Sequence, residues 1–367
     1  MTVEREIAGF ALPFAAGVLS ASLFSSISHQ TLNAAAMPLC AVCIIFLTTY
    51  QKRESPDAAL IRWIIFLCAF LTGMFCFSNA AIIETGATEG AGALTSFAHS
   101  CCVSVQEVID SLPFKDRKTA ALIKALLTGE KSSIPGDVAE AFRVSGASHI
   151  LALSGMHLGI IYGIVSRTLA FAGNSRDAVR ARSMTIIVIC AFYTLAVGAG
   201  ESIVRAFLFI LLSEISRLTH RFRSLRQTLM TALIIQLALS PASIESLGFQ
   251  LSYAAMAGIA FIHPWLRGLW PDTGRKANML QRIWNMASMS ISCQLTTGPL
   301  AWYYFRSFPT HFLLTNLIAI PLTGLIVPSA ILTLVMHSLG ICPDFLISLT
   351  EALTSAMTGS LAVIAEM

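Results

Sequence analysis

Long apolar runs alternate with short polar stretches along the whole chain. A helix needs roughly 20 consecutive apolar residues to cross a bilayer, and several of the runs reach that length. No sustained alternation of apolar and polar residues, the pattern typical of a strand, interrupts them. The runs cover residues 7–27, 34–50, 62–83, 148–170, 184–200, 203–216, 227–240, 248–264, 284–304, 311–337 and 345–364. The pattern therefore predicts an all-α fold, a polytopic transmembrane helical bundle of about 10–11 spans.

The longest interruption, between the third and fourth runs, divides the chain into three predicted parts. These are an N-terminal three-helix membrane region (1–83), an external linker with amphipathic helices (84–146) and a transmembrane core (147–367). Within the linker, the mixed spacing of Arg117–Leu127 predicts a surface helix that Gly129 ends. The apolar side chains on one face of that helix are Leu122, Ile123, Leu126 and Leu127. We expect this face to lie flat at the bilayer interface.

The amino-acid composition excludes several classes of protein. Hydrophobic residues make up 55% of the 367 residues and charged residues 12%, with a mean hydropathy of +0.73, whereas soluble chains carry about 25% charged residues. This excludes a soluble nucleic-acid-binding domain, a disordered regulator and a disulfide-knit secreted module, but not an intramembrane enzyme. The nine cysteines lie mostly in apolar runs, and the Cys40/Cys43 pair lacks a second pair or a nearby histidine. We therefore expect no metal and no cofactor.

Basic residues gather in alternate loops. Clusters of Lys and Arg follow the second, fourth, sixth and eighth apolar runs, and cytoplasmic loops carry such an excess of positive charge. The distribution predicts a multi-pass protein of the bacterial inner membrane with a cytoplasmic N-terminus. Residues 84–147 are then expected outside.

One predicted span combines glycines at four-residue spacing with a serine and a histidine. Gly155, Gly159 and Gly163 form a stripe of small residues that favours close helix packing in lipid. Ser154 and His157 lie on the same predicted helix, and a histidine within the membrane indicates a functional site. Two alternatives stay open for the pair. His157 can bond a backbone carbonyl, or Ser154 can be the nucleophile of an intramembrane serine hydrolase.

Further polar residues interrupt apolar surroundings at three places. Glu201 and Arg205 have the i, i+4 spacing of a helical ion pair. Gln250 begins one span, and Asn316 precedes a proline in another. Several such breaks in one bundle favour a hydrophilic path or binding cavity. No phosphate-binding loop, zinc-protease motif or pair of catalytic carboxylates is found.

These stretches, taken in order, resemble the ComEC family of competence proteins. The resemblance covers about residues 120–335. It rests on Leu126-Leu-Thr-Gly129-Glu-Lys, on Phe142-Arg143 through Ser145-Gly146, on His149 and Leu-Ser154-Gly155-Met-His157-Leu-Gly159, on Glu201…Arg205-Ala206, on Gly248-Phe-Gln250-Leu-Ser252-Tyr253, and on Tyr303-Tyr-Phe…Thr315-Asn316-Leu-Ile-Ala-Ile-Pro321.

The resemblance implies a channel that passes single-stranded DNA across the inner membrane during natural transformation. The expected residues of the DNA path or gate are Arg143, His149, Ser154, His157, Glu201, Arg205, Gln250 and Asn316. Full-length members also carry an oligonucleotide-binding-type domain and a metallo-β-lactamase-like domain, neither of which is recognised in this sequence. We therefore expect no enzyme activity. The implied partners are single-stranded DNA, the lipid bilayer, a cytoplasmic ATP-driven motor, external DNA-capture or nuclease proteins, and further copies of the chain. A small-solute transporter and the intramembrane hydrolase are the alternatives.

Overall fold

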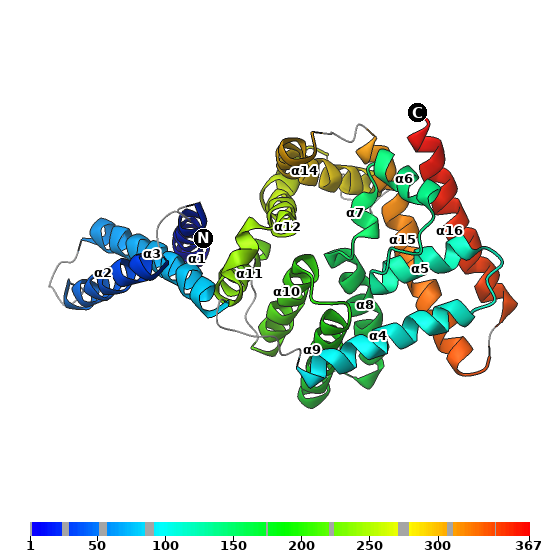
Figure 1. Ribbon diagram of the computed structural model, residues 1–367, viewed down its shortest axis with the longest axis horizontal. Helices are drawn as coiled ribbons and strands as arrows, with labels where there is room; N and C mark the ends of the chain where they lie inside the picture. The colour runs from blue at the N-terminus through cyan, green and yellow to red at the C-terminus, as the bar shows by residue number, and fades with distance from the viewer. Residues whose placement is uncertain are drawn as a thin grey trace. The chain divides into compact units, whose positions relative to one another are not determined.

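The described part of the chain is all-helical in the computed structural model (Figure 1). The model describes residues 2–23, 29–50, 57–84, 92–173, 175–219, 224–270, 279–306, 311–341 and 343–367. Contacts divide the chain into unit 1, residues 1–90 and 222–260, and unit 2, residues 91–221 and 261–367. The predicted fold class is confirmed, and the three-part division of the sequence stays a prediction.

Unit 1 is built on the packing of α1 against α3. Its elements are α1 (Thr2–Leu23), α2 (His29–Tyr50), α3 (Ala58–Glu84), α11 (Leu225–Leu239), the 3-10 turn η2 (Pro241–Glu245) and α12 (Leu247–Ala257). At the crossing of α1 and α3, the Cα of Gly17 faces the Phe70 carbonyl, and that of Gly73 faces the Phe14 carbonyl. Both contacts are so close that an added Cβ would collide with backbone. The sequence analysis did not identify this glycine pair.

Unit 2 contains several apolar helix clusters, two of which concern the predicted site residues. Its elements are α4 (Ala93–Ser111), α5 (Arg117–Thr128), α6 (Gly136–Val144), α7 (Ser148–Leu151), α8 (Gly155–Thr168), η1 (Leu169–Ala172), α9 (Arg176–Ala196), α10 (Glu201–Leu218), α13 (His263–Gly268), α14 (Met279–Phe305), α15 (Phe312–Ser338) and α16 (Asp344–Ala365). The larger apolar core joins α5, α6 and α7 to α15 and α16, and a smaller one joins α8, α9 and α10. These two cores hold the segments in which most of the predicted site residues lie.

Five described helices are long and apolar enough to cross a membrane. They are Glu4–Leu23 in α1, Ala58–Ala80 in α3, and the whole of α9, α15 and α16. The apolar part of α2 and the helix α11 are shorter. The multi-pass character is confirmed, whereas the expected 10–11 spans stay a prediction.

One predicted span is broken in the structure, and another contains a local change of helix type. The run 148–170 separates into α7 and α8, because Ser154 has an extended backbone and begins α8 as its N-cap. The run 248–264 continues from α12 through a π-helical turn, Gly258–Ile262, into α13. Hydropathy averages over many residues, so it does not resolve a break of two or three residues inside an apolar run.

The amphipathic helix α5 begins and ends close to the prediction, but its apolar face contacts protein. Gly129 ends the helix with a positive φ of 80°, a conformation that glycine adopts without strain. The four apolar side chains of the predicted bilayer-facing stripe are buried in the core with α15 and α16. An apolar stripe shows that a helix face is covered, but not whether lipid or protein covers it.

Candidate functional site

The break between α7 and α8 brings Ser154 and His157 together. Ser154 Oγ accepts a hydrogen bond from the Met156 N–H at 3.3 Å, and His157 Nδ1 accepts one from the Ser154 N–H at 3.2 Å. The two side chains are also 3.2 Å apart, from Oγ to Nδ1. Together they form a capping box, in which two side chains satisfy backbone donors at the start of a helix. The bond to a backbone carbonyl that we considered for His157 is replaced by one from a backbone amide.

The other ring nitrogen of His157 is buried. The side chain is 1% exposed, and its Nε2 has no hydrogen-bond partner among the residues that the structure describes. Because Nδ1 accepts a hydrogen bond, the neutral ring carries its proton on Nε2. His157 therefore presents a buried N–H donor that the described part of the protein does not satisfy. Such groups are rare in native proteins and indicate an unseen water, ion or ligand.

Helix α10 approaches the same turn of α8. A Cβ at Gly155 would lie 3.2 Å from the Ala206 Cβ and 3.9 Å from Nη2 of Arg205. Arg205 is 7% exposed, so its guanidinium group is buried close to the first residue of α8. Gly159 and Gly163, by contrast, face open space. Their role in helix packing stays a prediction.

Asn316 and His149 belong to the same unit. Asn316 lies on α15, which packs against α8, and its Oδ1 is buried without a hydrogen-bond partner among the described residues. His149 on α7 donates from Nδ1 to the Gly146 carbonyl at 3.1 Å. The structure therefore places His149, Ser154, His157, Arg205 and Asn316 on contacting elements of unit 2.

The remaining predicted residues lie elsewhere. Arg143 is exposed on α6 and forms an ion pair with Glu140 at 2.5 Å. Glu201 opens α10 in its first turn. Gln250 lies on α12 in unit 1, where its Nε2 donates to the Ile244 carbonyl at 3.0 Å. All eight predicted path or gate residues stay predictions in that role.

The sequence analysis missed a buried carboxylate, that of Glu214 on α10. Its side chain is 0% exposed. It accepts hydrogen bonds from Tyr162 Oη on α8 at 2.9 Å and from Ser183 Oγ on α9 at 2.7 Å, and it lies 3.2 Å from Arg217 Nη1. Glu214 thus connects three helices. An acid inside an otherwise apolar run was the signal that could have identified it.

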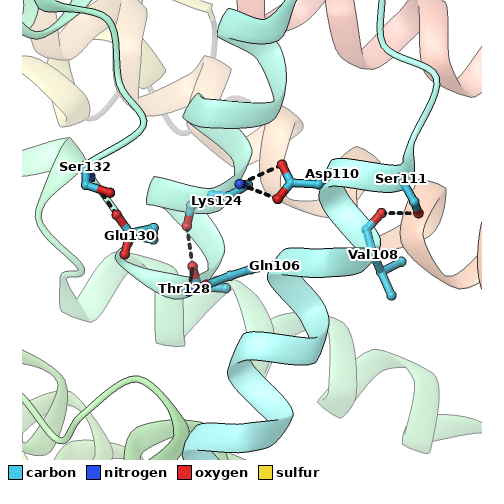
Figure 2. Close-up of polar contacts among 8 residues, drawn as sticks. All are labelled: Gln106, Val108, Asp110, Ser111, Lys124, Thr128, Glu130 and Ser132. Carbon is cyan, nitrogen blue, oxygen red and sulfur yellow. Dashed lines mark hydrogen bonds and ion pairs between the residues drawn. The ribbon is translucent and has the colours of Figure 1, made fainter.

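Polar side chains also connect α4 to α5 (Figure 2). Lys124 Nζ forms an ion pair with Asp110 at 2.6 Å, and Gln106 Nε2 donates to Thr128 Oγ1 at 3.1 Å. In the loop after α5, hydrogen bonds from the Ser132 side chain and backbone lower the pKa of Glu130. These contacts hold α5 and the loop that follows it, and the chain continues from this loop into α6 and α7. Among the described residues, no three His, Cys, Asp or Glu side chains gather in a way that could hold a metal ion.

The region containing these residues matches a known family. The sequence profile of the family described as Competence protein matches residues 126–367, which is more than half of the chain. The chain belongs to the Competence protein family. The match to this family begins in α5 and includes all the site elements of unit 2 from α6 onward.

Two curated relatives carry the same similarity. ComE operon protein 3 of Bacillus subtilis is 24% identical over 224 residues, which are 60% of this chain and 27% of the relative. Uncharacterized protein YcaI of Escherichia coli is 24% identical over 275 residues, 74% of this chain and 34% of the relative. The chain thus spans about a third or less of these relatives. No solved structure matches.

Proposed function

We propose that the chain is the membrane part of a conduit for single-stranded DNA in natural transformation. Membership of the Competence protein family supports this function. In the structure, the observation that carries the proposal is the buried Nε2–H of His157, which has no acceptor among the residues that the structure describes. A buried donor left without a partner costs about 1–3 kcal/mol, and water or a passing ligand removes that cost.

The proposed conduit lies in the bacterial inner membrane with a cytoplasmic N-terminus. It has no enzyme activity of its own, so a cytoplasmic ATP-driven motor supplies energy, and external proteins capture and process the DNA. The buried His157, Arg205 and Asn316 supply polar and positive groups at membrane depth. Such groups wet a path and attract phosphates.

The contact between Ser154 and His157 supports a second candidate function, that of an intramembrane serine hydrolase. A serine beside a histidine nitrogen is the usual arrangement of a nucleophile and its base. Here, however, Nδ1 already accepts the Ser154 N–H and Oγ already accepts the Met156 N–H, which favours helix capping. Covalent labelling of Ser154 by a fluorophosphonate probe would support the hydrolase and contradict the capping role.

Substitutions at His157 separate helix capping from the buried donor. In His157→Asn, the amide oxygen replaces Nδ1 but no group reaches the position of Nε2. In His157→Gln, the longer amide reaches that position. Because one buried hydrogen bond is worth about 1–3 kcal/mol, we expect DNA uptake to fall about tenfold or more in the Asn variant, and less in the Gln variant. The measurement is entry of labelled DNA into a DNase-resistant form, at equal amounts of membrane protein. Wild-type uptake in the Asn variant would refute the proposal.

A further inference from the structure

Residues 112–145 follow the full length of the apolar helix α15. At one end, Ser111 Oγ lies 3.2 Å from Nε2 of His337, near the end of α15. At the other end, Thr315 Oγ1, near the start of α15, donates to the Ser145 carbonyl at 2.7 Å. The 22 residues from Thr315 to His337 correspond to about 33 Å of helix. This length is close to the thickness of a bilayer core, about 30 Å.

Helix α5 lies at the middle of this path. Its Thr119 Oγ1 is 3.1 Å from Thr354 Oγ1, at the midpoint of α16, and just before α5 the Lys115 N–H donates to Glu351 of α16. The apolar face of α5 shares a core with Ile326, near the midpoint of α15. Figure 1 shows α5 lying across both helices. α15 and α16 are long and apolar enough to cross a membrane, so a bilayer crossed by these two helices would surround α5 as well.

A charged helix that does not span the membrane is tolerated at this depth only where protein covers it or water reaches it. Protein covers the apolar face of α5, but Lys118 at its start has a side chain that is 45% exposed. Lys118 forms an ion pair with Asp137 of α6 at 2.6 Å, and Asp137 is 65% exposed. These exposed charges require water.

A groove of about 470 Å³ lies beside this ion pair. One wall carries Lys118, Asp137 and Glu140, and the other carries Thr358, Gly359 and Ala362 of α16. A groove of this size has room for several water molecules. The second wall belongs to the half of α16 that follows its midpoint, so the groove opens within the length of a candidate span.

We propose that residues 112–145 form a re-entrant segment at membrane depth, and that its charged side and α16 enclose a water-filled groove of the conduit. The assignment of this groove to the DNA path rests on the proposed function. Lys118 and Arg143 are each paired with an acid, Asp137 and Glu140. Glu366 also lines the groove, so the acids of this groove outnumber its bases, and a polyanion that passes is not held by excess positive charge. This proposed placement differs from the expectation of an external linker with amphipathic interfacial helices over residues 84–146, which stays a prediction.

Single cysteines distinguish water from lipid around the segment. Lys118→Cys and Asp137→Cys test the groove, and Val363→Cys, an exposed position on α16, is the matched control. Each is placed in a chain whose nine native cysteines are replaced by alanine, and is labelled with a fluorescent maleimide in vesicles containing lipids with brominated acyl chains. We expect the brominated lipids to quench the fluorophore at position 363 but not the fluorophore at 118 or 137. In a separate measurement, the unlabelled cysteines at 118 and 137 should react readily with charged, water-soluble thiol reagents.

Two results would overturn the proposal. Quenching at 118 or 137 would place the segment against lipid, and no quenching at 363 would place α16 outside the bilayer. The double variant Thr119→Cys/Thr354→Cys checks the fold, because copper phenanthroline with oxygen should join these neighbouring positions through a disulfide. None of these measurements uses DNA. Failure of the uptake test at His157 would therefore remove the role in DNA passage and leave the wet groove standing.

Discussion

At the residue scale, two buried ionisable side chains of unit 2 differ in their hydrogen bonding. Three donors surround the Glu214 carboxylate, from Tyr162, Ser183 and Arg217. The Nε2–H of His157 has no acceptor among the described residues. Removing one member of a satisfied buried charge network destabilises helix packing, whereas a buried donor without an acceptor indicates an unseen water, ion or ligand. We therefore expect a structural role for Glu214, whereas the role of His157 in the proposed conduit stays a prediction.

Removing the Glu214 carboxylate should destabilise the bundle of α8, α9 and α10. Glu214→Ala leaves the Tyr162 and Ser183 hydroxyls and the Arg217 guanidinium without their acceptor, and breaking such a buried pair costs about 3 kcal/mol. Thermal unfolding in detergent should show a clearly lower Tm for this variant, a smaller decrease for Glu214→Gln, and none for Glu245→Ala at an exposed turn. An unchanged Tm in Glu214→Ala would contradict the structural role.

At the element scale, the sequence predicts where helices lie better than what they contact. The cap at Gly129 follows from local chemistry, so the end of α5 was predicted closely. The break before Gly155 was missed, because Ser154 and its neighbours look like part of one apolar run. Which helices cross at Gly17 and Gly73 depends on tertiary packing, about which a single sequence gives no information.

The crossing of α1 and α3 gives a test with a control in the same helix. In Gly17→Ala the new methyl group collides with the Phe70 carbonyl, and such overpacking costs about 1–3 kcal/mol. Gly9 on the same helix has open space around it, so Gly9→Ala should be neutral or slightly stabilising through helix propensity. Unfolding of both purified variants in detergent measures the difference. Equal stability of the two would show that the helices do not approach closely at Gly17.

At the scale of the whole molecule, composition alone identified a multi-pass helical protein, and the described candidate spans agree. The residues of the proposed conduit could not be selected in the same way. Every polar residue within an apolar run met the sequence criterion for a path residue. The structure separates His157, Arg205 and Asn316, which lie in unit 2, from Gln250, which lies in unit 1. Burial and hydrogen bonding distinguish among them, and neither is visible in a linear pattern.

The orientation of the chain is the last prediction, and it follows from its charge distribution. Basic loops stay in the cytoplasm because positive charges resist translocation, and basic residues follow the second apolar run but not the third. Alkaline phosphatase fused after Tyr50, the end of α2, should therefore be inactive, and the same enzyme fused after Glu84, the end of α3, should be active. Green fluorescent protein at the same two positions should give the opposite pattern and serves as the control. Active phosphatase after Tyr50 would reverse the orientation, and the proposed motor would then face the wrong side of the conduit.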